Sequence, residues 1–407
     1  MFQLFEIIEP IIYYRSSEHM KEIADNSIQL IITSPPYGNI KDYGIKEQIG
    51  FSQNFKQYFT RLNLVWNECF RILEPKCRMV INIGDQYLRA SEHGRYRIIS
   101  IASKIIEDCT KMGFDFLGDI IWQKISTTNT TGGCSLMGSI YYPRNGLLTF
   151  DYEHILIFKK YEGKPKKVER DRKEFSKISL SEWKKWYVGH WKFPGEVQKE
   201  HMAMFPEELP YRIIRMFSFI GDKVLDPFTG SGTTLKVAKS LFRKGIGYEI
   251  NKEFKKTIID KINEAKTGFF KDYQYFLYVL YKQSTEEDFS IKFQDQKRKG
   301  IVIIENNENK KIILDYLLVS NGKNTSLERE ILIKLEENTV LNYLIREDDE
   351  FVNTKFIIII KHSNKEIKEI EKILKEIAQR YNTKNKFDII QFNDIMKKDF
   401  QFSRLFS

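Results

Sequence analysis

Two short stretches of this chain of 407 residues combine residue types that could do chemistry on a flat ligand. The first is TSPPY (33–37), which follows the strand-like run IQLIIT. Proline gives no N–H to a sheet and fixes φ near about −65°, so Ser34, Pro35, Pro36 and Tyr37 must leave the sheet as a stiff loop. The loop offers carbonyl oxygens, one hydroxyl and a flat ring. These groups suit a planar ligand with hydrogens to donate.

The second stretch is DPFTGSGTT (226–234), between the strand-like KVL and the helix-like LKVAKSLFRKG. Gly230 and Gly232 allow a tight turn and a close approach of the backbone to a ligand, and the helix start offers free N–H groups. Glu249 comes seventeen residues after Gly232, at the end of the next strand. A carboxylate there can accept hydrogen bonds from both hydroxyls of a ribose. The pattern predicts a nucleoside pocket.

The type of nucleoside follows from what surrounds the glycines. No lysine follows Gly232, which excludes a GxxxxGK[ST] phosphate loop, and a full GxGxxG is absent. Asp226 is a poor neighbour for a pyrophosphate but a good one for an ammonium group. S-adenosylmethionine carries a ribose, an ammonium group and a sulfonium, so it fits this loop better than a dinucleotide does.

The elements that must position these loops alternate between strands and helices. Apolar spacing indicates helices at 53–73 and 206–219. Several strand-like runs are apolar almost throughout, as in a parallel sheet covered on both faces. The sequence therefore predicts an α/β fold with a doubly wound, mostly parallel sheet, and ligands at the carboxyl ends of its strands. The strand-like runs are 10–14, 28–33, 78–84, 118–124, 154–160, 223–228 and 245–250.

Composition narrows the class of protein. The chain is 42% hydrophobic and 29% charged, as in ordinary globular proteins, and no apolar run approaches the roughly 20 residues of a membrane span. The amino terminus, MFQLFEIIEP, has acids where a signal peptide needs positive charge, so we expect a cytoplasmic protein. The cysteines form no CxxC pair, which argues against disulfides and zinc and favours buried thiols at Cys69, Cys77, Cys109 and Cys134.

Half of the net charge of +10 lies in residues 159–177, where nine Lys or Arg face four acids. Three of the five tryptophans follow within 183–195. Phosphates attract such charge and bases stack on such rings, so this region predicts nucleic-acid binding. A solvated loop beside a small aromatic cluster is the alternative. The predicted DNA contacts are Lys166, Lys167, Arg170, Arg172, Lys173, Trp183, Trp186 and Trp191.

Taken together, the two loops resemble those of the beta-class DNA amino-methyltransferases. In that family an (S/D/N)PP(Y/F) loop lies near the amino terminus and a DPFxGSGTT loop comes much later. TSPPY matches the cytosine-N4 version. The resemblance extends over about residues 6–265 and includes RILEPKCRMVINIGD (71–85), DYEHILIFKK (151–160) and HMAMFPEELPYRII (201–214).

The resemblance implies a role for each matching residue. Glu249 would bind the ribose, Phe205 and Pro206 would close over the cofactor, and Ser34 to Tyr37 would hold the target base. Relatives often carry Gly-Asp where this chain has Tyr14 and Arg15, so the usual acidic contact there lacks its residue. The residues implied around the methionine part of S-adenosylmethionine are Asp226, Phe228, Gly230, Gly232 and Thr233.

The TSPPY loop can now be interpreted chemically. The lone pair of a base's exocyclic amine is delocalised into the ring, and two acceptors on the amine hydrogens would localise it toward the methyl group. Ser34 Oγ and the Pro35 carbonyl are suitably placed, and the prolines limit reorganisation during transfer. Tyr37 would stack on the base once it is flipped from duplex DNA. Methylation at carbon 5 would need a Pro-Cys nucleophile, which this sequence lacks, and no residue stands out as a dedicated general base.

The resemblance implies a catalytic domain over 1–270, and we interpret 125–200 as a target-recognition insert outside the main sheet. Residues 271–300 are predicted to connect it to a smaller α/β domain at 301–407. Between 297 and 407 there are 21 basic and 18 acidic residues, so the charge of this domain gives no reason to expect DNA binding. No nuclease D…(E)xK cluster can be placed in it. We expect it to contact a partner or to help site recognition.

We therefore predict a site-specific methyltransferase that modifies cytosine N4 in double-stranded DNA, paired with a separate restriction endonuclease. Three alternatives remain. Adenine N6 also offers an amine with two hydrogens. A nicotinamide-dependent dehydrogenase would share the glycine loop and Glu249 but would leave TSPPY unexplained. A non-catalytic DNA-binding protein would need no cofactor pocket.

Overall fold

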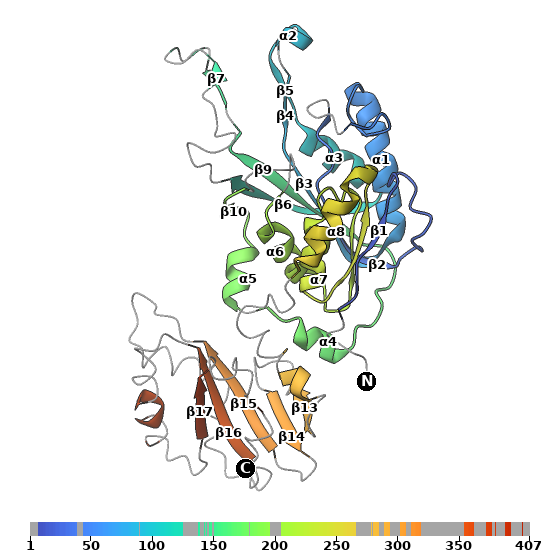
Figure 1. Cartoon of the computed structure of the whole chain (residues 1–407). Helices are drawn as coiled ribbons and strands as arrows, with labels where there is room; N and C mark the ends of the chain where they lie inside the picture. Colours follow the sequence, from blue (N-terminus) through green and yellow to red (C-terminus); the bar gives the residue numbers. More distant parts are fainter. Residues whose placement is uncertain are drawn as a thin grey trace. The chain divides into compact units, whose positions relative to one another are not determined.

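The computed structural model divides the chain into two compact units, Met1–Phe269 and Phe270–Ser407 (Figure 1). Each unit is considered by itself. The residues that the structure describes are 7–38, 44–88, 90–124, 137–138, 142, 144, 146–148, 150–178, 180–195, 205–265, 278, 280–284, 289–293, 302–306, 311–318, 354–361, 372–376, 379, 387–391 and 401.

The first unit is built on a sheet of eight strands in the order β1-β12-β11-β2-β3-β9-β6-β10. The five strands from β1 to β3 in this order are parallel, β9 is antiparallel to both of its neighbours, and β10 is parallel to β6. This confirms the predicted α/β fold with a mostly parallel sheet. The strands are β1 (Ile11–Tyr13), β2 (Ile28–Thr33), β3 (Leu73–Ile83), β6 (Phe114–Lys124), β9 (Tyr152–Lys160), β10 (His190–Phe193), β11 (Lys223–Asp226) and β12 (Lys244–Tyr248).

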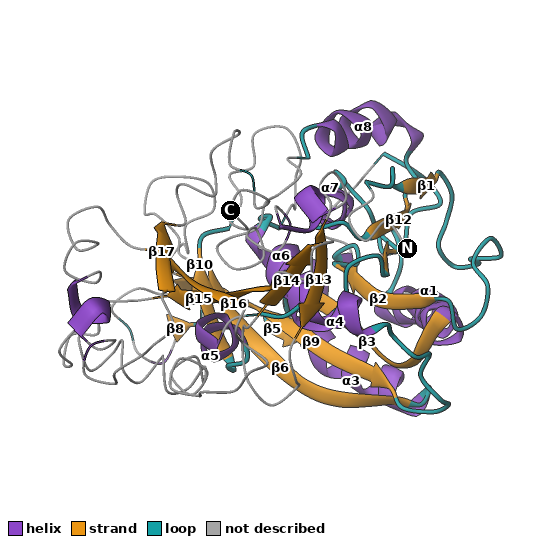
Figure 2. Ribbon diagram, turned by 90° about the horizontal axis from the view of Figure 1, so that it is seen from below, coloured by secondary structure: helices purple, strands orange, loops and turns teal. Residues whose placement is uncertain are grey.

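Helices cover both faces of this sheet (Figure 2). On one face α1 (Phe55–Ile72) and α3 (Ile101–Lys111) pack on each other and on β3, β6 and β9. On the other face α6 (Glu208–Phe217), α7 (Thr233–Ser240) and α8 (Lys255–Asn263) form a second layer over β2, β3, β11 and β12. The short helices α4 (Arg170–Phe175), α5 (Leu180–Trp186) and η3 (Lys252–Phe254) lie in connections.

Helix α1 shows how local sequence sets an element. Asn54 Oδ1 accepts from the Gln57 backbone N–H (2.9 Å) and Gln57 Oε1 accepts from the Asn54 backbone N–H (3.0 Å), which is a capping box. The buried side chains recur at the helical period, so one face meets the sheet. These side chains are Tyr58, Leu62, Val65, Trp66, Cys69 and Ile72.

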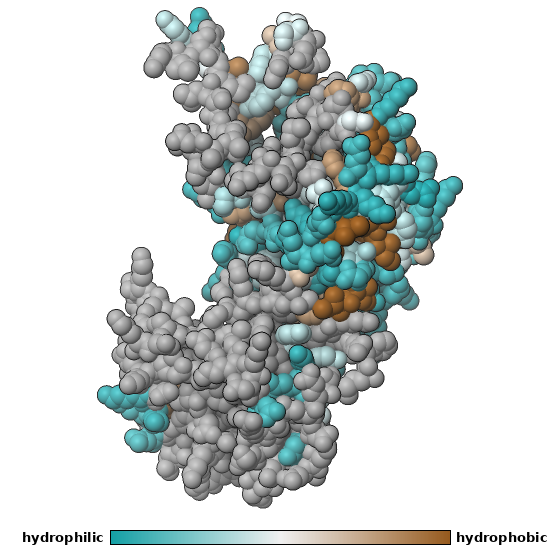
Figure 3. Space-filling view, in the orientation of Figure 1, coloured by the Kyte–Doolittle hydropathy of each residue, from teal (hydrophilic) through white to brown (hydrophobic). Residues whose placement is uncertain are grey.

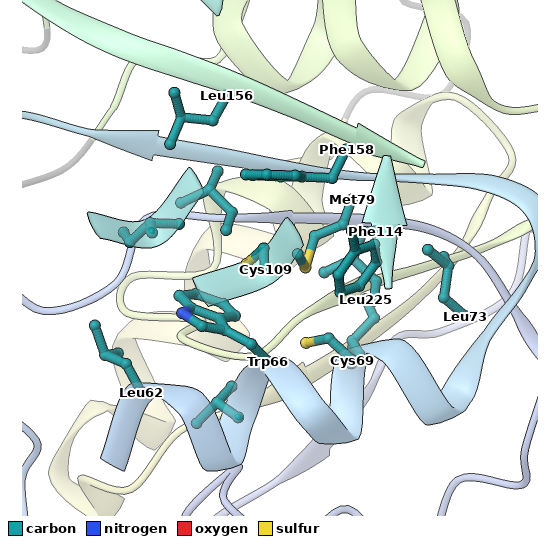
Figure 4. Packing of buried hydrophobic residues seen from close by; sticks show 14 of the residues in the cluster. Leu62, Trp66, Cys69, Leu73, Met79, Cys109, Phe114, Leu156, Phe158 and Leu225 are labelled. Carbon is teal, nitrogen blue, oxygen red and sulfur yellow. The ribbon is translucent and has the colours of Figure 1, made fainter. Parts of the chain in front are cut away.

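Figure 4 shows the core between α1 and the sheet, where Trp66 and Cys69 face Met79, Leu225 and Phe158. The expectation of buried thiols holds for Cys69 and Cys109, and burial raises the pKa of both. Cys77 is half-buried, with its pKa raised to about 12 by burial. Cys134 lies outside the described residues.

The predicted insert at 125–200 is partly wrong. Strand β9 runs between β3 and β6 in the main sheet, and β10 extends the same sheet beyond β6. The reason lies in the pattern of β9, where Ile155, Leu156 and Phe158 are fully buried between two paired neighbours. A short hairpin of β7 (Met137–Gly138) and β8 (Gly146–Leu147) lies in the same stretch, and 125–136 and 196–200 lie outside the described residues.

The second unit contains a five-stranded sheet in the order β13-β14-β15-β16-β17. Strand β13 (Phe289–Phe293) lies within the predicted connector and pairs antiparallel with β14 (Val302–Asn306). Strands β15 (Lys311–Leu318), β16 (Thr354–Lys361) and β17 (Phe387–Gln391) are mutually parallel. Residues 319–353 lie outside the described residues, and residues 372–376 are helical.

Within the described ranges, no helix has the length and apolarity needed to cross a membrane.

The packing of α1 leads to a test of the fold. Trp66 is fully buried, so Trp66→Ala should lower the free energy of unfolding by about 3 to 5 kcal/mol. All five tryptophans lie in the first unit, so the remaining tryptophan fluorescence reports its urea unfolding alone. Leu64→Ala is the control, because Leu64 on the same helix is 41% exposed and its loss should cost no more than about 0.5 kcal/mol. Equal effects of the two changes would contradict the packing described here.

Candidate active site

The two loops singled out in the sequence meet because β2 and β11 are neighbours in the sheet. Leu30 pairs with Val224 and Ile31 with Leu225, so both strands end at the same edge. The loop 34–37 leaves β2 there and the loop 227–232 leaves β11 there. This confirms that the carboxyl edge of the sheet assembles the predicted residues.

Asp226 joins the two loops. Its Oδ1 accepts from Thr33 Oγ1 (2.8 Å) and from the Phe228 backbone N–H (3.0 Å), and its Oδ2 accepts from Thr234 Oγ1 (2.7 Å). The carboxylate is 1% exposed, and burial raises its pKa to about 6. Asp226 thus supports both loops and the start of α7. The chain's own donors thus hold the carboxylate in place, and its contact with a cofactor ammonium stays a prediction.

The two glycines of the second loop differ in what they allow. Both have positive φ, +54° at Gly230 and +89° at Gly232. A Cβ at Gly230 would have only the Phe228 carbonyl oxygen within 4 Å, at 3.9 Å, so this position faces open space. A Cβ at Gly232 would lie 3.0 Å from Ile258 of α8. Gly230 is therefore the one that a ligand can approach, and Gly232 serves packing.

Glu249 follows β12 and reaches back to the glycine loop. Its Oε2 accepts from the Gly230 backbone N–H (2.9 Å) and its Oε1 from the Asn251 backbone N–H (2.8 Å). The side chain is 9% exposed, and burial, reinforced by nearby Asp226, raises its pKa to about 7. A carboxylate has about four acceptor sites, so the group keeps capacity for a ligand hydroxyl. The carboxylate and the open space at Gly230 fit the ribose of an adenosine-type cofactor.

Phe205 and Pro206 come just before α6, with Pro206 buried and Phe205 half-buried. The Pro206 carbonyl accepts from the Leu209 backbone N–H (3.0 Å). Glu207 forms an ion pair with Lys236 of α7 (2.8 Å), which connects this segment to the helix after the glycine loop. Phe228 packs edge-on against Trp66 (6.2 Å between centroids), and Thr233 is buried at the start of α7. His201 lies outside the described residues.

The TSPPY loop is fastened to α1 by one carbonyl. Pro36 O accepts from Tyr58 Oη (2.8 Å) and from the Gly38 backbone N–H (3.2 Å). Neither Ser34 Oγ nor the Pro35 carbonyl accepts a hydrogen bond from a residue that the structure describes. The loop therefore holds Pro36 rigidly and leaves these two acceptors available for a ligand.

Sequence reasoning missed Glu153, which lies beside Tyr37. A Cβ at Gly84 would lie 3.4 Å from Glu153 Cγ and 3.6 Å from Tyr37 Cε1, so both side chains border the same small gap over Gly84. Glu153 forms an ion pair with Lys124 of β6. The available signal was a carboxylate at the start of a strand whose centre, ILIF, is apolar and whose first residues reach this edge.

A second missed pair is His154 and Asp119, also on β9 and β6. His154 Nδ1 lies 2.6 Å from Asp119 Oδ2, and this hydrogen bond raises the pKa of His154. Asp85 and His190 are two further polar residues of this sheet region. Asp85 Oδ1 accepts from the Ala102 backbone N–H at the start of α3 (3.1 Å), and His190 is exposed on the edge strand β10.

The basic run at 159–177 lies at the other edge of the sheet. Arg172 Nη2 is 2.5 Å from Asp222 Oδ1, just before β11, and Arg172 Nε donates to the Ile220 carbonyl (2.7 Å). Lys166 Nζ donates to the Asn26 carbonyl just before β2 (3.2 Å). The six residues of β2 separate this edge from the TSPPY loop by roughly 17 Å.

This placement bears on the predicted DNA surface. Lys167, Arg170 and Lys173 are exposed in the same run, which lies at the edge opposite the TSPPY loop, and their DNA contacts stay a prediction. The sequence showed that the charge is concentrated but not at which edge. Lys166 and Arg172 also bond to the chain itself, so part of the charge of the run is used within the protein.

The tryptophan cluster is corrected in part. Trp186 and Trp191 are 4% and 1% exposed, and Trp191 Nε1 donates to the Trp186 carbonyl (2.9 Å). The guanidinium groups of Arg215 and Arg212 lie over these two rings, 5.3 and 5.0 Å from the centroids. Neither ring can stack on a base. Trp183 is 51% exposed and stacks on Tyr187, so its DNA contact stays a prediction.

Among the described side chains, no group of three or more His, Cys, Asp or Glu could hold a metal ion. The fold, the open glycine loop and Glu249 instead define an S-adenosylmethionine-dependent methyltransferase. A family model described as "DNA methylase", the N6/N4 methylases, matches residues 28–261, more than half of the chain. The chain belongs to this family.

Individual relatives of the chain are methyltransferases as well. Type II methyltransferase M.MjaI of Methanocaldococcus jannaschii is 37% identical over 282 residues, which is 62% of this chain and 90% of that protein. Type II methyltransferase M.HpaI of Haemophilus parainfluenzae is 32% identical over 260 residues, 61% of this chain and 73% of that protein. TTHA0409 of Thermus thermophilus, solved with S-adenosylmethionine, superposes with a TM-score of 0.53 and 29% identity over 64% of this chain and 96% of that protein.

The chain is therefore a DNA methyltransferase of the restriction–modification type, and S-adenosylmethionine is its methyl donor. The dehydrogenase and the non-catalytic DNA-binding protein considered above are excluded. The family includes both N6 and N4 methylases, so membership in it does not distinguish between these two amines.

Glu249 leads to a prediction about stability and pH. Its pKa is about 7 in the folded protein and its ordinary value is 4.5, so the folded state binds this proton more tightly than the unfolded chain does. The free energy of unfolding should therefore lose about 2 to 3 kcal/mol as the pH rises from about 4.5 to about 7. Glu249→Gln should lack this loss. Urea unfolding of both proteins at several pH values measures the difference, and a constant difference would contradict the buried carboxylate.

Proposed function

We propose that this enzyme transfers a methyl group from S-adenosylmethionine to the N4 amine of a cytosine flipped out of duplex DNA. The hydrogen bond from Thr33 to Asp226 carries the proposal, because it holds the TSPPY loop beside the glycine loop (2.8 Å). An amine held by the first loop is then next to a methyl donor held by the second. The proposal makes the protein the modification half of a restriction–modification system.

The chemistry assigned to the first loop depends on its acceptors. S-adenosylmethionine supplies an electrophilic methyl group on a sulfonium. Ser34 Oγ and the Pro35 carbonyl accept the two amine hydrogens, which concentrates the nitrogen lone pair out of the ring plane. The nitrogen would then attack the methyl carbon, S-adenosylhomocysteine would leave with the electrons of the broken carbon–sulfur bond, and the amine proton would pass to water. Pro36, held by Tyr58, keeps the acceptors in place during this step.

The cofactor residues follow from the second loop. Glu249 accepts from the ribose hydroxyls with the lone pairs that Gly230 and Asn251 leave. Gly230 lets the backbone approach the ligand, Phe228 and Thr233 line the loop, and Asp226 supports it from below. Phe205 and Pro206 close over the cofactor from the segment before α6.

The target base stacks on Tyr37, a contact worth about 1 to 3 kcal/mol. Glu153 borders the same gap over Gly84, so its carboxylate is within reach of the edge of a base on Tyr37. We assign Glu153 as a positioning residue for the base.

Cytosine is favoured over adenine by Ser34. The loop reads Ser-Pro-Pro-Tyr, the form that resembles the cytosine-N4 enzymes, and its first residue is a neutral hydroxyl. Adenine N6 is the alternative, since a serine oxygen can accept from either amine. We propose double-stranded DNA as the substrate. A separate endonuclease would cut the unmodified site. The second unit would contact a partner or aid site recognition.

The cofactor assignment predicts that Glu249→Ala weakens S-adenosylmethionine binding about 10-fold or more, because hydrogen bonds to a charged group contribute about 1.5 to 3 kcal/mol. Isothermal titration of the purified protein measures this. Glu253→Ala is the matched control, since Glu253 is an exposed acid four residues away. Equal affinity of the Glu249 variant and the control would remove Glu249 from the ribose site.

The base assignment predicts N4-methylcytosine in the DNA of a host that has no amino-methylation of its own. Nucleosides from the digested plasmid are analysed by mass spectrometry. Tyr37→Ala should abolish the product, and Tyr37→Phe should retain it because the ring still stacks. N6-methyladenine as the only product would overturn the choice of base, and 5-methylcytosine would overturn the mechanism as well.

A further inference from the structure

A two-stranded arm leaves the sheet beside the TSPPY loop. Strand β4 (Gln86–Leu88) follows the carboxyl end of β3, the short helix α2 (Ala90–His93) turns the chain, and β5 (Arg97–Ile99) returns antiparallel to β4. We call the described residues 86–88 and 90–99 the β4–β5 arm. Figure 1 shows it projecting from the end of the first unit opposite α4, which carries part of the basic run, and Figure 3 shows the surface of the unit in the same orientation.

The base of the arm touches the loop that holds the target base. A Cβ at Gly38, the residue after Tyr37, would lie 2.8 Å from Gln86 Oε1, so the Gly38 backbone and the Gln86 side chain are in close contact. Any molecule seated on Tyr37 therefore lies at the foot of the arm.

Tyr87 makes the base of the arm rigid. Its hydroxyl donates to the Leu148 carbonyl (2.8 Å) and accepts from the Phe150 backbone N–H (2.8 Å). Its ring stacks on Phe150 (4.8 Å between centroids) and contacts Tyr96 (5.8 Å). These contacts tie the arm to the chain that leads into β9, so the arm has a fixed origin.

The arm carries two exposed arginines. Arg95 and Arg97 are exposed, and neither forms an ion pair or hydrogen bond with any residue in the described part of the chain. By contrast, Lys166 and Arg172 at the opposite edge are held by the chain's own oxygens.

The register places these charges at a useful distance from the base site. Gln86 pairs with Ile99 and Leu88 with Arg97, so Arg97 lies roughly 7 Å beyond Gln86 along the ribbon. Arg95 lies two residues further out. A nucleotide flipped onto Tyr37 keeps its flanking phosphates outside the pocket, and these are the nearest anions that DNA would bring to Arg97 and Arg95.

We propose that the β4–β5 arm grips the DNA backbone next to the flipped nucleotide through Arg95 and Arg97. This inference rests on the proposed function and moves the DNA surface from the basic run at the amino edge to the carboxyl edge. Phosphate contacts of this kind position the duplex without reading its sequence. The arm therefore sets where the strand enters, and other residues read the site.

The test compares the two surfaces in the full chain. Arg95→Gln/Arg97→Gln removes two charges from the arm, and Lys164→Ala/Lys167→Ala removes two from exposed positions of the basic run. Binding to a fluorescent duplex that carries the sequence modified by the enzyme is measured over a range of salt concentrations. Each phosphate contact contributes about 0.9 to the log–log slope, so the arm variant should lose about 1.8 in slope and the basic-run variant should keep that of the wild type.

Two further measurements keep the outcomes distinct. S-adenosylmethionine affinity and the thermal midpoint of the arm variant should match the wild type, and Arg95→Lys/Arg97→Lys should restore the slope because the charge returns. An unchanged slope in the arm variant overturns the inference, as does a slope that falls only in the basic-run variant. The product analysis is separate: a different methylated base would refute the proposed N4 chemistry while the slope still decides whether the arm binds DNA.

Discussion

The buried carboxylate of Asp226 is the interaction on which the site depends. It accepts from Thr33 at the end of β2, from Phe228 in the glycine loop and from Thr234 in α7. A buried carboxylate without these donors would cost several kcal/mol, so the three donors must stay where they are. The loop proposed to bind the base and the loop proposed to bind the cofactor are thus set relative to each other by one side chain.

Glu249 adds a second buried carboxylate beside the glycine loop. It holds the Gly230 backbone N–H, and its own pKa is raised by burial and by the nearby Asp226. Two acids at the end of adjacent strands would repel each other in the open. Here the backbone donors at Phe228, Gly230 and Asn251 compensate the charge, and the same oxygens remain able to accept from a ligand.

The carboxyl edge also determines which surfaces can meet DNA. The TSPPY loop, Glu153 and the β4–β5 arm all leave that edge, whereas the basic run and the buried tryptophans pack at strand beginnings or against α6. Net charge is a property of the whole molecule and attracts DNA from any side. If the target base is flipped as proposed, charge within reach of it, such as that of Arg95 and Arg97, should matter more for binding than a larger cluster elsewhere.

The sequence by itself determined the local chemistry: two prolines force a loop, two glycines permit a turn, and alternating apolar runs make the strands, with β2 predicted at its observed bounds. Family resemblance in the same residues predicted the cofactor. Tertiary structure decided what depends on neighbours in space. The pairing of β9 with β3 and β6 drew part of the predicted insert into the sheet and brought Glu153 beside Tyr37. A local pattern states which groups are present, but strand order and register decide which of them share an edge.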